Sequence, residues 1–344
     1  MRATLVLPTF NRCADLERAI TSLAGQTESV SEVIVVDNGS TDRTREMVEA
    51  LAQSGKLPFT LRYHRKDPEG PAAARTCGIA LSTTPVVGFV DSDVTLAPDW
   101  LGLCLAALDA DPALGAVAGP LVYAGDPGQM NSYGGCLSRL GLAWDGFEGA
   151  PLQSAAATRD VPWINSAALL ARRAALDDAG GFDPRFFYAY EESDLGWRMC
   201  IAGWRLRVIP DALAFHHVGD EIGQAAPGIV FHSCKNRLAS LLANAGPGWL
   251  ARWLPAYLAY ALLDAGLRAP RGPKLRALAW SLANLRGTLA RRQQIQSRRR
   301  VPDEVLSQLL EPRLFPEVRL AGRRRRPNRL QSINAPAGWT DDRV

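Results

Sequence analysis

Two aspartates, separated by one residue, close an apolar run in the N-terminal half of the chain. Residues 85–90 form the run, and Asp91-Ser92-Asp93 follows it directly. Such a run is typical of a buried parallel strand, and parallel sheets bind ligands at the carboxyl ends of their strands. Because alternate strand residues point the same way, Asp91 and Asp93 can converge on one ligand. Two carboxylates suit a divalent cation, and a cation suits a diphosphate, although the same pattern also caps helices and occurs in turns.

A second group of acids begins at Glu191, where Glu191, Glu192 and Asp194 lie within four residues. The aromatic-rich stretch 186–190 precedes them. Partial burial among aromatic rings would raise the pKa of a carboxylate toward the range of a general base. The alternative is structural, because acids at the start of a helix are stabilised by the helix dipole.

Two histidines, His216 and His217, follow a predicted strand over residues 206–209. An imidazole at that position could complete a metal site together with Asp93. A purely structural role for both rings is the alternative.

Residues 7–12 follow the first predicted strand, where a ligand of an open α/β sheet binds. They provide Pro8, Thr9, Asn11 and Arg12. The segment lacks the glycines of a P-loop and of a dinucleotide-binding loop, so nothing indicates those chemistries.

Two further segments could contact a nucleotide. Asp37 ends the second predicted strand, where its carboxylate can accept hydrogen bonds from a base or ribose, or cap a helix. Gly70 opens a helix with small residues, which favours a close anion. Arg75 lies one turn later and could contact phosphate, pair with a strand-end aspartate, or lie on the surface.

The elements that must position these residues alternate between strands and helices over residues 1–118. The predicted strands are residues 3–7, 33–36, 59–63 and 86–90, and the predicted helices include residues 14–24, 72–81 and 98–110. This alternation predicts an α/β fold with a doubly wound, mostly parallel central sheet.

The regular alternation stops at residue 119. Residues 119–160 are rich in Gly, Pro and Ala and predict loops with short strands. A predicted strand at 163–170 and predicted helices at 172–179 and 194–202 follow. We therefore expect a regular α/β half at 1–118 and a second half of the same domain at 119–228.

We expect a helical extension at residues 229–330 and a disordered tail at residues 331–344. The apolar stretch 253–263 has 11 residues, fewer than the about 20 that span a bilayer. A second apolar helix is expected at 275–289. These helices could lie in a membrane interface or simply pack on the domain.

Charge is distributed unevenly along the chain. Residues 1–264 carry 21 Lys and Arg against 29 Asp and Glu, whereas residues 265–330 carry 17 against 4. A basic segment behind an acidic domain suggests a polyanionic partner. The arginine clusters are 291–292, 298–300 and 323–326, which could meet anionic headgroups or be solvated. Nucleic acid is not expected, because few aromatic residues are interleaved and no recognition motif is present.

The six cysteines are scattered without a Cys-x-x-Cys pair, which indicates a reducing compartment rather than a zinc site or disulfide framework. The N-terminus runs directly into a strand without signal-peptide organisation. We therefore expect a cytoplasmic protein, either free or peripheral at the inner face of the cell membrane.

Taken together, these motifs resemble those of family 2 glycosyltransferases, which have the GT-A fold. The resemblance runs from about residue 4 to 244. The motifs that carry it are residues 7–12, 35–42, 70–75, 91–93 and 181–198. Residues 186–204 look most like rhamnosyltransferase-type members that extend cell-surface glycans.

The resemblance implies a metal-dependent, inverting transfer from a nucleotide-diphospho-sugar to a hydroxyl of a glycan or lipid-linked acceptor. It implies that Asp37 binds the base, that Asp91 lies near the ribose, and that Asp93 holds Mg²⁺ or Mn²⁺ with His216. The other donor-binding residues it implies are Pro8, Thr9, Asn11, Arg12, Gly70, Arg75 and Ser92.

The resemblance places the catalytic base at Glu192. The family usually has Asp there, so Glu191 or Asp194 could be the base instead. His216 matches the late histidine of the family better than His217, although the doublet leaves this open. By position, Trp163 and Asn165 would line the acceptor side.

Two other functions were considered. A nucleotidyltransferase also uses an α/β sheet and a carboxylate-bound metal, but it usually has a glycine-rich basic loop after its first strand, which residues 7–12 lack. A non-catalytic nucleotide-sugar-binding protein is compatible with the sequence, although the acidic cluster is intact.

Overall fold

The computed structural model of the chain describes residues 1–217 and 227–316. Its centre is an eight-stranded sheet in the order β11-β13-β6-β12-β4-β1-β2-β3. The strands are β1 (Ala3–Thr9), β2 (Glu32–Asp37), β3 (Thr60–Arg65), β4 (Val86–Val90), β6 (Leu114–Ala118), β11 (Arg159–Asp160), β12 (Ala168–Arg172) and β13 (Arg205–Val208). β1 to β4 are parallel to one another, whereas β12 runs antiparallel to both of its neighbours. The predicted mostly parallel α/β sheet is therefore confirmed.

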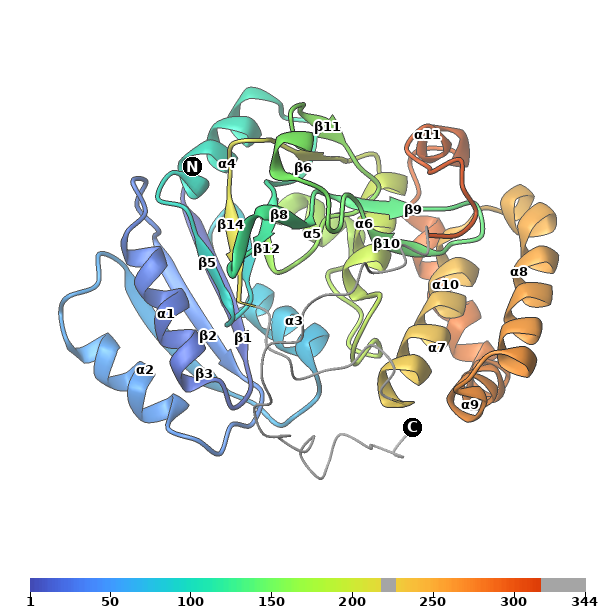
Figure 1. Ribbon diagram of the computed structural model, residues 1–344, viewed down its shortest axis with the longest axis horizontal. Helices are drawn as coiled ribbons and strands as arrows, with labels where there is room; N and C mark the ends of the chain where they lie inside the picture. Colours follow the sequence, from blue (N-terminus) through green and yellow to red (C-terminus); the bar gives the residue numbers. More distant parts are fainter. Residues whose placement is uncertain (218–226, 317–344) are drawn as a thin grey trace.

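Helices cover both faces of this sheet (Figure 1). The helices α1 (Cys13–Ala24), α2 (Thr44–Gln53) and α4 (Trp100–Ala110) pack on one face, and α3 (Pro71–Leu81), α5 (Arg173–Ala179) and α6 (Glu191–Ile201) on the other. Successive strand residues therefore enter different cores, as Leu5 and Val6 do. Burial on both faces is why the strands read as continuous apolar runs.

Two small sheets lie beside the central one. The first has the order β5-β14-β7-β8, and the second pairs β9 with β10. Their strands are β5 (Val94–Leu96), β7 (Leu121–Tyr123), β8 (Asp126–Ser132), β9 (Gly135–Leu137), β10 (Ala143–Asp145) and β14 (Ala214–His216). The irregular region at 119–160 thus consists largely of short strands, with one 3₁₀ turn at Leu152–Ser154.

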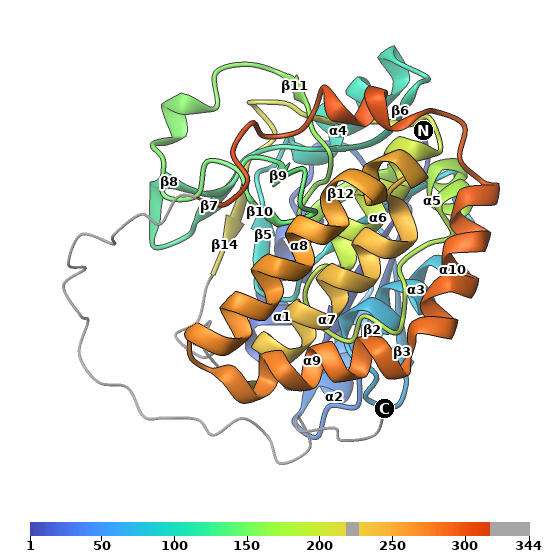
Figure 2. The same ribbon diagram turned by 90° about the vertical axis from the view of Figure 1, so that its right-hand side faces the viewer.

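Five further helices complete the fold: α7 (Pro227–Asn244), α8 (Pro247–Leu267), α9 (Arg271–Ala283), α10 (Leu285–Ser297) and α11 (Asp303–Ser307). α7 packs against α6, α9 and α10, and α8 packs against α9 (Figure 2). Across residues 1–217 and 227–316, no helix is long and apolar enough to cross a membrane. The predicted disordered tail, residues 331–344, lies outside the described residues.

Three predicted boundaries were wrong. The helix expected at 275–289 is divided at Asn284, whose side chain donates to the Trp280 carbonyl and so ends α9 (2.9 Å). The helix expected from Asp194 begins at Glu191, so all three acids lie in its first turn. The strand expected from Trp163 begins only at Ala168.

A buried ionic cluster attaches the C-terminal helices to α6. Arg291 of α10 contacts Asp183 (2.5 Å) and Asp194 (2.7 Å), and Asp194 also accepts from Arg198 (2.8 Å) and Asn244 (2.9 Å). Asp194 has no exposed surface. Burial alone would raise the pKa of Asp194, but the two arginines lower it to about 2.

Three of these arginines, Arg291, Arg292 and Arg299, are therefore bound inside the protein, whereas the expected contact of the clusters with lipid headgroups stays a prediction for the others. Arg292 donates to the Leu242 and Ala245 carbonyls, and Arg299 donates to the Asn244 carbonyl and Asp303. Arg298 donates to the Asp177 carbonyl (3.2 Å). The cluster at 323–326 lies outside the described residues.

We expect Arg291→Met to lower the free energy of unfolding by about 3 kcal/mol, because it leaves a buried carboxylate partly unpaired. The matched control is Arg300→Met. Arg300 pairs with Asp178 at 2.7 Å, but its side chain is 59% exposed, so we expect a loss below about 1 kcal/mol. Urea unfolding of the three proteins tests this, and equal losses for both variants would contradict the proposed importance of the buried cluster.

Candidate active site

The loops after β1 and β2 are tied together at one edge of the sheet. Asn11 has a left-handed backbone (φ 53°), its N–H donates to Ser40 Oγ (2.9 Å), and its side-chain oxygen accepts from Thr41 N–H (2.8 Å). Pro8 and Thr9 belong to β1 itself, with Thr9 opposite Asp37. These residues therefore shape the loop junction at the carboxyl ends of β1 and β2.

Asp37 is fully buried at the end of β2. Its two carboxylate oxygens accept from Ser40 N–H (2.7 Å) and from the Tyr63 hydroxyl (2.5 Å). As the structure stands, Asp37 holds the loop together, and base binding by this residue stays a prediction.

Asp93 and His216 come together through strand pairing. Asp93 immediately precedes β5, and β5 pairs antiparallel with β14 so that Val94 lies opposite His216. Asp93 Oδ1 lies 3.6 Å from His216 Nε2, and Asp93 Oδ2 lies 3.3 Å from the Arg12 guanidinium. His217 instead places its ring nitrogen 3.1 Å from the Thr95 hydroxyl. Of the two histidines, His216 is therefore the one beside the Asp93 carboxylate.

The surroundings of this pair fit a divalent cation. His216 Nδ1 lies 2.8 Å from Asn131 Oδ1, so an Nδ1–H donated to Asn131 leaves Nε2 free to coordinate. The 3.6 Å between Nε2 and Oδ1 is close to the separation of about 3 to 3.5 Å between two ligands of one cation. Across the described ranges, no group of three or more His, Cys, Asp or Glu forms a metal site. Other oxygen ligands would have to complete the coordination.

Electrostatics at the pair also favour a cation. Burial would raise the pKa of Asp93, but His216 and Arg12 lower it overall. Burial would lower the pKa of His216, but the Asp93 carboxylate outweighs it. The carboxylate therefore stays ionised and exerts a strong attraction on positive charge.

Arg75 connects the two acidic motifs. Its side chain is 4% exposed, and it contacts Asp91 Oδ1 (2.6 Å) and Glu191 Oε1 (3.3 Å). The Phe182 ring also packs on Arg75, with the guanidinium carbon 5.6 Å from the ring centroid. Of the three roles considered for Arg75, the structure shows pairing with the strand-end aspartate.

Gly70 and Ser92 have packing roles. Gly70 has a φ of 88°, and a Cβ there would lie 2.3 Å from the Phe187 carbonyl oxygen. This close approach brings the loop before α6 onto the start of α3. Ser92 is buried in the turn between Asp91 and Asp93.

The first turn of α6 holds two glutamates with different surroundings. Glu191 is buried and paired with Arg75, whereas Glu192 is partly exposed. Glu192 Oε2 has no hydrogen-bond partner among the described residues. Burial and the neighbouring charge of Glu191 raise the pKa of Glu192 well above its ordinary value of 4.5. Asp194, in contrast, is fully engaged in the ionic cluster and does not suit a base.

The structure adds Asp145, which the sequence did not single out. Its Oδ1 accepts from the Asn165 side chain (3.2 Å), and burial raises its pKa. Its charge contributes to the raised pKa values of both Glu192 and His216, so it faces the same site. Asp145 is one of three aspartates in the irregular region 119–160, and the sequence does not distinguish it from the other two.

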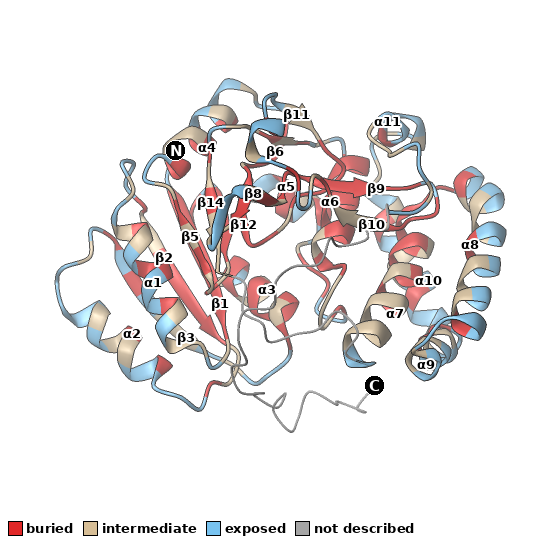
Figure 3. Cartoon of the chain, in the orientation of Figure 1, coloured by how far each residue is buried: buried red, intermediate tan, exposed pale blue. Residues whose placement is uncertain are grey.

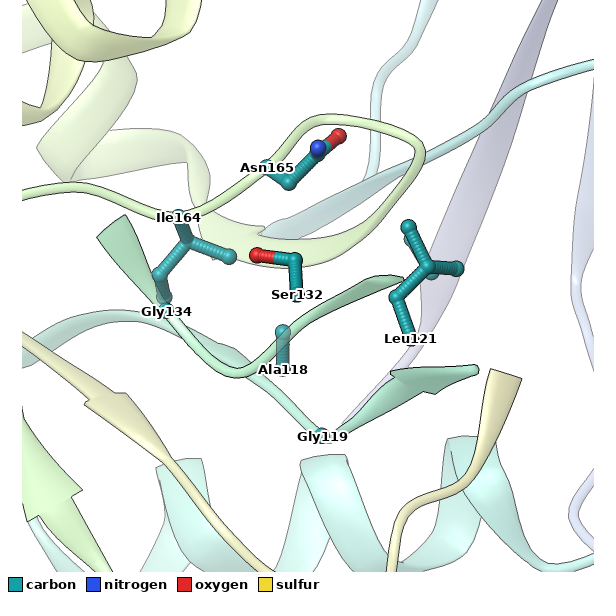
Figure 4. A pocket seen from close by; sticks show the side chains of 8 residues that line it. Ala118, Gly119, Leu121, Ser132, Gly134, Ile164 and Asn165 are labelled. Atoms are coloured by element: carbon teal, nitrogen blue, oxygen red, sulfur yellow. The ribbon is translucent and has the colours of Figure 1, made fainter. Parts of the chain in front are cut away.

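The two expected acceptor residues differ in their surroundings. Asn165 lines a small pocket with Ser132 and Ile164 (Figure 4). Trp163 is only 3% exposed, and its ring N–H donates to the Cys136 carbonyl (2.9 Å). Its ring also fills the space beside Gly135, where a Cβ would lie 1.9 Å from the indole. Trp163 is therefore a buried packing residue beside β9, and its ring does not form part of an exposed acceptor surface.

Comparisons with known proteins agree on one protein family. The model of "Glycosyl transferase family 2" matches residues 4–150, and that of "Glycosyl transferase family group 2" matches residues 86–226. The pre-mycofactocin glycosyltransferase of Mycobacterium tuberculosis is 34% identical over 262 residues, covering 72% of this chain and 52% of that protein. The chain thus spans about half the length of this curated relative.

A second relative from the same organism, N-acetylglucosaminyl-diphospho-decaprenol L-rhamnosyltransferase, is 29% identical over 301 residues, covering 79% of this chain and 96% of that protein. Two solved structures share the fold. GalNAc-T7 with UDP, GalNAc and Mn²⁺ has a TM-score of 0.61 at 16% identity, covering 79% of this chain and 52% of that one. S. aureus TarS 1–349 in complex with UDP-GlcNAc has a TM-score of 0.53 at 17% identity, covering 90% and 84%.

The family models, the two relatives and the shared fold agree with the strand-end carboxylates described above. The chain belongs to the family 2 glycosyltransferases and has their GT-A fold.

Proposed function

We propose that this protein is an inverting glycosyltransferase that moves a sugar from a nucleotide-diphospho-sugar to a hydroxyl of a glycan or lipid-linked acceptor in cell-surface polysaccharide synthesis. The observation that carries the proposal is the convergence of two carboxylate groups at one sheet edge. Asp93 with His216 suits a cation, and Glu192 suits a base. Arg75 fixes the spacing between the two through Asp91 and Glu191.

The donor would bind along the loops that follow β1, β2 and β4, as ligands of open α/β sheets do. Asp93 and His216 would hold Mg²⁺ or Mn²⁺, and the relative solved with UDP and Mn²⁺ supports a divalent metal. When bound, the cation supplies positive charge that offsets the charge developing on the leaving diphosphate. Arg12, 3.3 Å from Asp93, adds a second positive group at the same place.

Glu192 would act as the base. It takes the proton of the acceptor hydroxyl while that oxygen attacks the anomeric carbon and the bond from that carbon to the diphosphate breaks, which inverts the configuration. The raised pKa of Glu192 supports this role, because its conjugate base binds a proton more readily than an ordinary glutamate. Glu191 is held by Arg75 and would position Glu192.

The acceptor would lie beside Glu192, against Asp145 and Asn165. A carboxylate that accepts hydrogen bonds and an amide that can both donate and accept are suited to sugar hydroxyls. The relative named as a decaprenol-linked rhamnosyltransferase supports a lipid-linked acceptor.

The metal assignment predicts the behaviour of Asp93→Asn. In the wild-type protein, a nucleoside diphosphate with Mn²⁺ should raise the thermal midpoint, since a ligand at 100 times its dissociation constant stabilises by about 2.7 kcal/mol. We expect Asp93→Asn to lose the Mn²⁺-dependent part of this shift and all measurable turnover. The control is Asp99→Asn, an exposed carboxylate at the start of α4. Full activity of Asp93→Asn would refute the metal assignment.

The base assignment predicts opposite results for two neighbouring glutamates. Glu192→Gln should lower kcat by about 10² to 10⁴ while leaving donor binding unchanged. Glu191→Gln should retain more activity, because it alters a positioning contact. If Glu191→Gln abolishes transfer and Glu192→Gln does not, then Glu191 is the base.

The same assignment fixes the sign of the pH dependence. Because the base must be deprotonated, kcat/KM should fall as the pH drops, and the raised pKa moves this fall above the ordinary value of 4.5. The two glutamates interact, so the apparent pKa belongs to the pair. A pH–rate profile that stays flat well below neutrality, in protein shown to remain folded, would contradict the assignment.

The acceptor assignment predicts a selective defect. Asp145→Asn should raise the KM for the acceptor severalfold while leaving the KM for the donor unchanged, because the altered carboxylate accepts from Asn165 on the proposed acceptor side. Asp126→Asn on the exposed start of β8 is the matched control. Kinetics with each substrate varied in turn would detect a change in donor KM, which would place Asp145 in the donor site instead.

A further inference from the structure

The helices α8, α9 and α10 expose an unusual number of leucines. Among the described residues, eleven large hydrophobic side chains are exposed, and eight of them are leucines on these three helices. They are Leu258, Leu262, Leu263, Leu267, Leu275, Leu282, Leu285 and Leu289. The most exposed are Leu282 (76%) and Leu267 (72%). Large exposed apolar patches mark surfaces that bind a partner.

These helices turn their leucines away from the domain. In α9 and α10 the buried residues include Ala277, Ser281 and Thr288, which are small or polar, whereas Leu275 and Leu289 lie outside. A helix that only packs on a domain buries its large apolar residues and exposes its polar ones. Figure 3 shows the exposed surface along α8, on the side away from the central sheet. Because Tyr257 of α8, Leu278 of α9 and Ile295 of α10 pack against the core, these helices are apolar on both sides, which indicates that the outer side also has an apolar or amphipathic partner.

The charges on the same helices select the kind of partner. Residues 247–297 contain eight Lys and Arg but one acid. That acid, Asp264, is paired with Lys274 at 2.7 Å. Arg268, Arg271 and Arg286 are exposed. A second copy of the chain would bring like charges together across the contact, whereas an anionic lipid surface offers both hydrocarbon and negative headgroups.

The arrangement of these helices suits a surface better than a span. None of the helices in the described ranges can cross a bilayer. α8 and α9 pack against each other, and α10 follows α9 after Asn284, so the three helices lie on the side of the molecule that Figure 2 presents. Leucines exposed on this side can enter the headgroup boundary while the arginine side chains reach the phosphates.

We propose that the outer face of α8, α9 and α10 lies on an anionic lipid bilayer, with its leucines inserted and Arg268, Arg271 and Arg286 on the lipid phosphates. This face differs from the arginine clusters that the sequence suggested, since Arg291, Arg292 and Arg299 are bound inside the protein. The proposal does not depend on sugar transfer, because lipid binding is a property of this face alone.

The test is sedimentation of the full chain with vesicles of phosphatidylcholine, either alone or mixed with phosphatidylglycerol. We expect the wild-type protein to bind the anionic vesicles. The triple variant Leu262→Gln, Leu267→Gln and Leu282→Gln should bind at least about tenfold more weakly. The triple variant Arg268→Gln, Arg271→Gln and Arg286→Gln should lose about fivefold per arginine and most of the preference for anionic lipid.

Two controls separate this face from other surfaces. Val305→Gln removes an exposed apolar side chain of α11 and should leave vesicle binding unchanged. The variant with Arg323, Arg324, Arg325 and Arg326 all changed to Gln tests the basic segment at the end of the chain, and it should retain the leucine-dependent binding. Thermal midpoints of all variants should match the wild type, because every changed side chain of α8–α11 is exposed.

Three results would overturn the proposal. One is unchanged vesicle binding by the leucine variant. Another is complete loss of binding in the variant at 323–326 alone. The third is a combination of two observations: the wild-type protein does not bind vesicles, and light scattering without lipid shows it to be a dimer. In that case the leucine variant would be a monomer. The last result would assign the face to a second copy. Donor binding is measured separately by thermal shift. It tests the proposed glycosyltransferase function without reference to vesicle binding.

Discussion

The active site is organised by one buried cation, the guanidinium of Arg75. A buried charge is costly unless it is paired and hydrogen-bonded. Arg75 meets this requirement with Asp91 at the end of β4 and Glu191 at the start of α6, which lie 100 residues apart in sequence. Burial would lower the pKa of Arg75, but these carboxylates raise it, so the arginine stays charged. The bridge therefore fixes the distance between the strand that carries Asp93 and the helix that carries Glu192.

The same bridge makes the two glutamates unequal. Glu191 Oε1 lies 3.3 Å from the Arg75 guanidinium, whereas no ion pair to Glu192 occurs among the described residues; each of the two glutamates keeps one buried oxygen without a hydrogen-bond partner there. When two carboxylates are this close, ionisation of one disfavours ionisation of the other. The charge of Glu191 consequently adds to the effect of burial on Glu192. This difference is the basis of our proposal that Glu191 positions Glu192 and that Glu192 accepts the proton.

The C-terminal helices contact the helix that carries the two glutamates. Arg291 reaches from α10 to Asp194, two residues beyond Glu192 on the same helical turn. Asp194 also accepts hydrogen bonds from Arg198 and Asn244, so side chains from α6, α7 and α10 meet at its carboxylate. Anchoring Asp194 in this way restricts the orientation of the turn that bears Glu192. It also explains why a strongly basic segment follows an acidic domain: part of the charge is neutralised internally.

Several features could be predicted from the sequence because they depend on local patterns. Apolar runs that end in Asp37 and Asp91 indicated parallel strands with acids at their carboxyl ends, since side chains of a doubly buried strand must be apolar throughout. The acids at 191–194 indicated a helix start. Residues 7–12, 35–42, 70–75 and 91–93 suggested the family by their resemblance to its motifs. The strands and the helix start are short-range features, so composition and periodicity suffice to find them.

Other features were decided only by the tertiary structure. Which histidine lies beside Asp93 follows from the register of β5 and β14, and Asp145 enters the site only because β10 folds back toward it. The sequence did not indicate partners for the arginines at 291–300, yet Arg291, Arg292 and Arg298 contact carboxylates or carbonyls 50 or more residues away. The sequence left open whether the apolar helices meet a membrane interface or pack on the domain, and the structure leaves eight of their leucines exposed. A linear pattern specifies which residues can pair or be buried, whereas their actual partners depend on long-range packing.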